Sequence, residues 1–193
     1  MSGSTMFGRC TEEAKRAIFY ARYEASFQSV GEITTGHILV GIIRERESHS
    51  VAADFLKDNE TNLRSTLGVP LPCGKPVTDL MKDIPLDRNA KMTLAFAFNE
   101  AELDNSFYIY TDHLLRGILR FPNEASDALQ SISLDLAKAR DASKLIRAKY
   151  PYKKTLYHRL FGRPFQAHRV ALAKLLLFMI VVTLATLLIR WIN

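Results

Sequence analysis

Two stretches of this sequence decide its fold: Thr35-Gly-His-Ile-Leu-Val-Gly-Ile-Ile-Arg44 and, 76 residues later, Thr111-Asp-His-Leu-Leu-Arg-Gly-Ile-Leu-Arg120. Around them, residues 11–44 align with residues 87–120 without a gap, and 12 of the 34 aligned positions are identical. A fixed offset over this length indicates a duplicated unit of supersecondary structure. We therefore expect two related copies of one unit that pack together, with residues 6–67 as copy one and 84–149 as copy two.

Helical spacing dominates both copies. Thr11 and Asp87 are good helix N-cap residues, and small residues follow each of them at helical spacing. No stretch alternates in the way that a strand does, so the fold class is expected to be all-α. A Pro-rich linker, residues 68–83, separates the copies. Two shorter helices complete each copy, at Ser50–Lys57, Glu60–Leu67, Glu124–Ser131 and Leu134–Arg147, with three residues deleted from the preceding loop of copy two.

The second helix of each copy contains a histidine and a glycine at matching places. These helices are expected over His37–Arg44 and His113–Arg120, with Thr35 and Thr111 as their caps. The glycines in question, Gly41 and Gly117, fall in mid-helix, where glycine is costly, so close helix packing is the expected reason for them. Packing and local hydrogen bonding explain the paired histidines better than catalysis, and the duplicated acids Glu24 and Glu100 are expected to form structural ion pairs.

The charge of the chain is concentrated in its tail. The net charge is +6, but residues 1–150 contain 19 Lys/Arg and 20 Asp/Glu, whereas residues 151–193 contain seven Lys/Arg and no acid. This distribution argues against nucleic acid as a partner. Cys10 and Cys73 have no metal-ligand or disulfide spacing, so neither a metal nor a cofactor is expected.

The tail has the features of a membrane anchor. Residues 150–169 mix aromatic and basic side chains, and residues 170–189 form a run with Lys174 as its one charged residue. Twenty residues of helix span a bilayer core. Lys174 would extend toward the near interface, while Arg190 and Trp191 anchor the far one. Because six Lys/Arg precede the run and one follows it, we expect a tail anchor in a bacterial inner membrane, in contact with lipid, with the copies in the cytoplasm.

The repeated stretches are similar to a known signature. Met6-Phe-Gly-Arg-Cys-Thr-Glu-Glu-Ala-Lys15 resembles the opening of the N-terminal domain of Clp unfoldases, and the two stretches quoted first resemble that family's doubled Gly-Thr-Glu-His-Ile-Leu-Leu-Gly-Leu. The resemblance covers residues 6–149. It implies eight helices in two pseudo-twofold-related four-helix repeats that bind adaptor proteins and substrate peptides. No ATPase module is expected in residues 150–193.

The resemblance also bears on ligand recognition. Some Clp N-domains hold phosphoarginine in two pockets, where an acid binds the guanidinium group and a threonine helps to hold the phosphate. Copy one has Thr11 but Gly36 in the acidic place, and copy two has Asp112 but Asp87 in the threonine place. Glu32 is a candidate substitute for the missing acid. Because each pocket retains only half of its charge pattern, phosphoarginine recognition by these pockets is not expected.

The candidate partner-binding residues are therefore of two kinds. The pocket positions are Thr11, Glu32, Asp87 and Asp112, and the copy-specific aromatic residues of the loop after the first helix are Phe107, Tyr108 and Tyr110, matched in copy one by Phe27 and Val30. Exposed aromatic side chains anchor protein interfaces, but core filling is an equally good explanation here. The leading hypothesis is a membrane-tethered adaptor or substrate receptor for a Clp-type ATPase. The alternatives are a decoy that sequesters Clp adaptors or substrates and a small helical enzyme.

Overall fold

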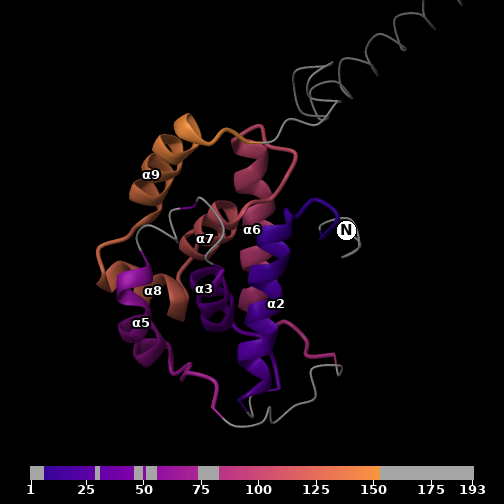
Figure 1. Cartoon of the computed structure of the whole chain (residues 1–193), viewed down its shortest axis with the longest axis vertical. Coiled ribbons are helices and arrows are strands. Elements are labelled where there is room, and N and C mark those ends of the chain that lie inside the picture. Colours follow the sequence, from indigo (N-terminus) through magenta and orange to yellow (C-terminus); the bar gives the residue numbers. More distant parts are fainter. Residues whose placement is uncertain (1–6, 29–30, 46–49, 51–55, 74–82, 153–193) are drawn as a thin grey trace, which may run out of the picture. The chain divides into compact units, whose positions relative to one another are not determined.

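The computed structural model describes residues 7–28, 31–45, 50, 56–73 and 83–152. Within these residues the chain forms seven α-helices and one 3-10 turn, and no strand longer than an isolated bridge (Figure 1). The helices are α2 (Glu12–Ser26), α3 (Thr35–Arg44), α5 (Glu60–Leu67), α6 (Arg88–Leu103), α7 (Thr111–Leu119), α8 (Glu124–Ser131) and α9 (Leu136–Lys149), and the 3-10 turn is Lys57–Asn59. The expected all-α class is confirmed.

Two isolated bridges show the pseudo-twofold relation between the copies. Cys10 pairs with Ile109, and Ile33 pairs with Leu86, both in parallel. Adding 76 to the numbers of one bridge gives the other, with the copies exchanged. In the first bridge Thr11 N donates to Ile109 O at 3.0 Å, and in the second the amide of the equivalent residue, Asp87, donates to Ile33 O at 3.0 Å. Each copy therefore completes the start of the other copy's first helix.

The two second helices lie at the centre of the molecule. Every residue of α7, and every residue of α3 up to Ile43, is buried. Each central helix packs on the first helix of its own copy, α3 on α2 and α7 on α6 (Figure 1). A Cβ at Gly41 would lie 2.2 Å from Ala17 O, and one at Gly117 would lie 2.4 Å from Thr93 O. The expected close approach at these glycines is confirmed.

The histidines cap the central helices. His37 Nδ1 accepts a hydrogen bond from Thr34 N at 3.0 Å, and His113 Nδ1 accepts one from Tyr110 N at 2.9 Å. This confirms the expected local hydrogen bonding. The N-caps are therefore Thr34 and Tyr110, so the expectation that Thr35 and Thr111 cap these helices is wrong by one residue. The histidine takes the place of the Glu or Gln in a capping box, which moves the helix start by one position.

The offset of 76 continues into the last helix of each copy. Arg64 on α5 and Arg140 on α9 occupy equivalent positions and make equivalent bidentate contacts to Glu24 and Glu100. The expected three-residue deletion is therefore wrong. α9 runs over Leu136–Lys149 rather than Leu134–Arg147, because Asp135 is the N-cap and accepts from Lys138 N. Glu60–Leu67 and Glu124–Ser131 are confirmed, and the expected helix Ser50–Lys57 falls largely outside the described residues.

The expected membrane segment also falls outside the described residues, as do Val30, Lys174, Arg190, Trp191 and residues 153–169. In the part of the chain that the structure does describe, none of the helices has the length and apolar character needed to cross a bilayer. Tyr152 is described, and it packs against α7 and α9 side chains. The folded copy two therefore extends into the segment 150–169 that the sequence assigned to the membrane surface.

Candidate functional site

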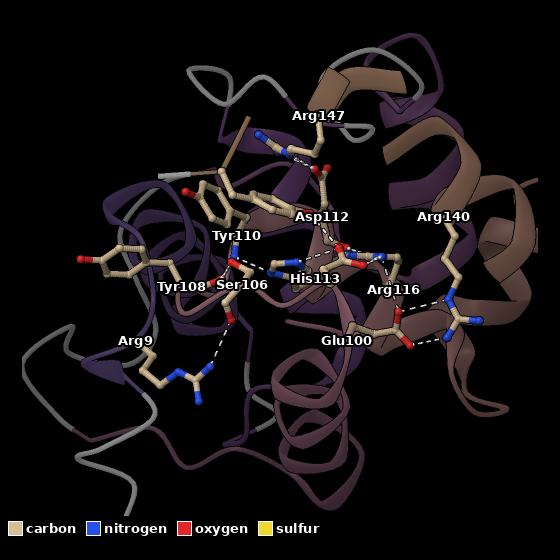
Figure 2. A network of polar contacts seen from close by, with 12 residues as sticks. Arg9, Glu100, Ser106, Tyr108, Tyr110, Asp112, His113, Arg116, Arg140 and Arg147 are labelled. Atoms are coloured by element: carbon tan, nitrogen blue, oxygen red, sulfur yellow. Dashed lines mark hydrogen bonds and ion pairs between the residues drawn. The ribbon is translucent and has the colours of Figure 1, made fainter. Parts of the chain in front are cut away.

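Copy two contains a cluster of charged residues between α6, α7 and α9 (Figure 2). We call it the charged cluster and define it as Glu100, Asp104, Asp112, His113, Arg116, Arg120, Arg140, Arg147 and Tyr152. Three carboxylates are its centres, and each is held by at least one arginine from a different helical turn.

Glu100 is the most deeply buried of these carboxylates. It is 0% exposed and accepts hydrogen bonds from Arg120 Nη1 at 2.6 Å and from Arg140 Nη2 at 2.6 Å and Nε at 3.1 Å. Arg116 lies 3.6 Å away. Burial works against the charged form, but the hydrogen bonds from Arg140 and Arg120 and the charge of Arg116 outweigh it, so the pKa of Glu100 is below its ordinary value. The expected structural ion pairs at Glu24 and Glu100 are confirmed.

Asp104 connects α7 to Tyr152. Its carboxylate accepts hydrogen bonds from Arg116, from Tyr152 Oη at 2.9 Å and from His113 Nε2 at 3.2 Å. Because Nδ1 of His113 already accepts a backbone N–H, Nε2 is the nitrogen that carries the proton. Burial alone would raise the pKa of Asp104, but these three donors hold it well below its ordinary value. Burial, together with the Asp104 charge, raises the pKa of Tyr152.

Asp112 binds an arginine from the end of α9. It is 0% exposed, and its Oδ2 accepts from Arg147 Nε at 3.1 Å and from Arg147 Nη2. The guanidinium group lies 5.0 Å from the Tyr110 ring and 4.7 Å from the Tyr152 ring, and the two rings are 4.6 Å apart. Stacking of this kind strengthens the attraction of an arginine for its site. Figure 2 shows Arg147 directed toward Asp112, with Tyr110 nearby. Two predicted site residues, Tyr110 and Asp112, thus meet around Arg147.

The charged cluster is specific to copy two. At the equivalent positions copy one has Gln28 for Asp104, Gly36 for Asp112, Val40 for Arg116 and Leu71 for Arg147. The acids and the arginines that pair with them have therefore changed together. What remains in copy one is the Glu24 site, where Arg44 and Arg64 repeat the contacts of Arg120 and Arg140. The two copies share a framework but present different chemistry.

In copy one a carboxylate from the other copy approaches Gly36. Glu124, at the start of α8, accepts hydrogen bonds from Gly36 N and from Thr35 Oγ1, both at 3.2 Å. The exposed Glu32, which the sequence suggested for this place, is not the residue that occupies it. Sequence reasoning missed Glu124 because it lies 88 residues away and belongs to copy two. No signal in a single sequence identifies such a contact.

The aromatic candidates of copy two lie partly on the surface. Phe107 is 39% exposed, and the guanidinium group of Arg9 is 5.1 Å from its ring centre. The Tyr108 ring packs on Phe107 in an edge-on geometry, and Arg9 also donates to Phe107 O at 2.7 Å. Figure 2 shows Arg9 and Tyr108 on one side of the cluster, away from Arg140. These aromatic residues therefore form a second surface, distinct from the three carboxylates.

The arrangement offers binding groups rather than catalytic ones. Among the described residues, no group of three or more His, Cys, Asp or Glu could hold a metal ion. Burial lowers the pKa of both His37 and His113, and nearby acids only partly oppose this. Burial also raises the pKa of the Cys10 thiol to about 11, so this cysteine is a poor nucleophile. The candidate acids Glu24 and Glu100 are held by arginines.

A comparison with known families identifies this framework. The family model described as the Clp repeat (R) N-terminal domain matches residues 9–132, which run from before α2 to the end of α8. The chain belongs to this family. The match includes both copies, in agreement with the resemblance seen in the sequence.

Curated relatives of this Clp N-domain chain are much longer proteins. An ATP-dependent Clp protease ATP-binding subunit ClpA homolog from Guillardia theta is 34% identical over 137 residues, and the chaperone protein ClpB from Oceanobacillus iheyensis is 30% identical over 139 residues. Each alignment covers 70% of this chain but only 16% and 17%, respectively, of the relative.

Solved structures show the same fold. The N-terminal domain of the chaperone ClpD from Arabidopsis thaliana aligns with a TM-score of 0.54 at 21% identity and covers 77% of this chain and 99% of that domain. The N-terminal domain of the ClpV1 ATPase from E. coli gives a TM-score of 0.57 at 19% identity and covers 79% and 95%, respectively. Both likenesses support the Clp N-domain architecture and nothing finer.

The family's two expected pocket positions have structural roles in this chain. Thr11 Oγ1 caps α2 by accepting from Ala14 N at 3.3 Å, and Asp87 Oδ1 caps α6 by accepting from Ala90 N at 2.6 Å. Because the bridges cross between copies, Thr11 lies beside Ile109 of copy two and Asp87 beside Ile33 of copy one. The sequence grouped these residues within each copy, whereas the backbone pairs them across the copies.

Proposed function

We propose that this chain is a non-catalytic protein-binding module of the Clp N-domain type, acting as an adaptor or substrate receptor for a Clp-type unfoldase or protease. The observation that carries this proposal is the family match over both copies. Clp N-domains bind substrates and adaptors. The described acids and histidines serve packing, capping and ion pairing, which is in keeping with binding rather than catalysis.

The copy-specific residues are the proposed recognition surfaces. A framework that is shared by the whole family cannot by itself select a partner, because selection requires groups that differ from one family member or copy to another. In this chain the charged cluster and the exposed Phe107 with Tyr108 supply such groups on copy two. We assign partner binding to these surfaces rather than to the capped positions Thr11 and Asp87.

Membrane tethering is the second part of the proposal, and it rests on the sequence of residues 150–193. The apolar run 170–189 and the excess of Lys/Arg before it are the features that support it. A tether would hold the module at the cytoplasmic face and raise its local concentration near membrane proteins without a new contact. A soluble partner would then be recruited to the membrane by this chain.

Proximity labelling in cells tests the binding role. The bait is the full chain with a labelling enzyme at its N-terminus, and the matched variants are Phe107→Ser and Phe19→Ser, which change two exposed phenylalanines, 39% and 57% exposed. We expect the wild type and Phe19→Ser to label a Clp-type ATPase, an adaptor or a degradation substrate, and Phe107→Ser to lose part of that set. A wild-type bait that labels none of them above an unrelated membrane bait would contradict the proposal.

The sign of the effect on protein turnover separates the receptor from the decoy. Deletion of a receptor slows the degradation of its partners, whereas deletion of a decoy frees adaptors and speeds degradation. We expect slower turnover of the labelled proteins in the deletion strain, measured by pulse-chase. Faster turnover would assign the chain to the decoy function.

A further inference from the structure

The charged cluster borders a cavity of about 350 Å³ between α6, α7 and α9. One face of α9 forms its basic wall, with Arg140, Ser143 and Lys144 at helical positions i, i+3 and i+4. Leu103, at the end of α6 and 62% exposed, adds an apolar edge. None of these four residues was singled out in the sequence.

Copy one provides an internal comparison for this wall. The residues equivalent to Ser143 and Lys144 are Leu67 and Gly68, while Arg64 matches Arg140. Leu67 packs against the hydrophobic core at the place where copy two has a small hydroxyl side chain. The change from leucine to serine removes apolar volume, and the change from glycine to lysine adds a cation. Both changes favour a polar ligand in copy two.

Hydrogen-bond donors at this wall lack partners within the described part of the chain. Ser143 is 2% exposed, and its Oγ makes no hydrogen bond to any described residue. A buried hydroxyl without a partner is unfavourable, so a ligand atom that accepts from it would stabilise the site. Arg140 uses Nε and Nη2 for Glu100, and no described residue is bonded to Nη1.

Lys144 is also available to a ligand. Its one ion pair among the described residues is with Asp141, and the two side chains are 76% and 73% exposed, respectively. Exposed pairs of this kind contribute little, so Lys144 can turn to a better partner at small cost. The lysine stem can reach over the neighbouring apolar edge while its ammonium group contacts the ligand.

The charge around the cavity is unbalanced by one unit. Five cations (Arg116, Arg120, Arg140, Lys144 and Arg147) face four carboxylates (Glu100, Asp104, Asp112 and Asp141). His113 adds no charge near neutral pH, since burial lowers its pKa. A single negative charge would balance the set. Residues 151–193 contain no Asp or Glu, so the tail of this chain has no acidic side chain to offer.

We propose that this cavity is a carboxylate pocket that takes an aspartate or glutamate side chain of a partner protein. Arg140 Nη1, Ser143 Oγ and Lys144 Nζ donate to the carboxylate, and Leu103 contacts the apolar part of the partner residue. The pocket deepens the proposed protein-binding function and rests on it. Because copy one has Leu67 in place of the serine, the pocket exists on one side of the molecule only.

Peptide binding to the full chain in detergent micelles tests the pocket. The probes are fluorescein-labelled octapeptides in 150 mM salt, one with four glutamates, one with glutamines and one with phosphoserines at the same places, and the readout is fluorescence anisotropy. The main variant, Ser143→Leu, introduces the copy-one residue and leaves every charge unchanged. Nonspecific attraction of acidic peptides to the basic tail is then the same in both proteins.

We expect the glutamate peptide to bind the wild type at least tenfold more tightly than the glutamine peptide. Ser143→Leu should weaken its binding about tenfold with no fall in melting temperature, and Lys144→Gln should weaken it several-fold. Lys91→Gln, an exposed charge change at the far end of α6, should leave binding unchanged.

Three results would overturn the pocket: equal binding of the glutamate peptide by wild type and Ser143→Leu, no binding of any peptide, or a phosphoserine peptide that binds at least tenfold more tightly than the glutamate peptide. The last result would reassign the cavity to phosphoryl groups. Failure of the pocket is distinguishable from failure of the proposed function. A Ser143→Leu bait that labels the same partners as the wild type in cells refutes the pocket alone, whereas a wild-type bait without partners refutes the function.

Discussion

At the scale of single residues, Gly41 and Gly117 allow the first and second helices of each copy to touch. We expect Gly41→Ala to lower the free energy of unfolding by about 1–3 kcal/mol, because the added methyl group would lie 2.2 Å from Ala17 O and the backbones must separate. This loss exceeds the helix-propensity gain of about 1 kcal/mol. Urea unfolding followed by circular dichroism measures it.

Gly36, in the same helix, is the matched control. A Cβ there would have no neighbour closer than 3.4 Å, which is ordinary contact, so Gly36→Ala should change stability by no more than about 0.5 kcal/mol. Equal losses for the two variants would show that the close approach at Gly41 is not what limits the residue type.

Residues that occur twice could be predicted from the sequence, and residues that occur once could not. The duplication itself pointed to the packing role of the two glycines and to structural pairing of Glu24 and Glu100. Arg147 and Glu124 reach their partners Asp112 and Gly36 from 35 and 88 residues away and have no counterpart contact to reveal them. Asp112 was identified by its place in the motif, but the arginine that binds it was not.

At the scale of helices, the start of α3 depends on a neutral histidine. His37 Nδ1 accepts from Thr34 N, and protonation of that nitrogen would remove the acceptor. Burial lowers the pKa of His37 in the folded state, while acids such as Glu124 only partly oppose this. The unfolded chain therefore binds more protons just below the ordinary histidine pKa of 6.5, so stability falls as the pH drops through that value toward the folded pKa.

The variant His37→Gln tests this cap. Glutamine at the third helical position can accept the same backbone hydrogen bond without titrating. We expect the unfolding free energy of the variant to depend less steeply on pH between 7.5 and 5.5, by at most about 1.4 kcal/mol per pH unit. Thermal or urea unfolding over that range provides the measurement. Parallel curves for the two proteins would contradict a titrating His37.

Helix positions followed from the sequence more closely than helix ends. Spacing and N-cap chemistry placed the starts of α2 and α6 correctly, because Thr11 and Asp87 are local signals. The expected start of α9 at Leu134 was wrong. Leu134 is 0% exposed and suits a helical core position, yet it precedes Asp135, whose side chain sets the true N-terminus. A buried leucine before a cap does not differ in sequence from one inside the helix.

At the scale of the whole molecule, duplication has produced a symmetric frame with asymmetric surfaces. The crossed bridges at Cys10–Ile109 and Ile33–Leu86 bind the copies into one unit. Within that frame only copy two has the charged cluster and its cavity. Two equivalent sites would bind two similar ligands, whereas this arrangement suits a single polar partner on copy two. The pseudo-symmetry was predictable from the offset of 76, and the division of roles was not, because it depends on which substitutions meet in space.

The tail supplies the last prediction at this scale. If residues 170–189 span a bilayer, the full chain expressed in bacteria should remain in the membrane pellet after extraction with alkaline carbonate. An arginine at the centre of a span costs about 2.5–3.5 kcal/mol, so the double variant Phe178→Arg and Val182→Arg should move most of the protein to the supernatant. The matched control, Phe178→Leu with Val182→Leu, keeps the run apolar and should stay in the pellet. Release of the wild type by carbonate would contradict the anchor and would leave the Clp N-domain assignment of residues 9–132 untouched.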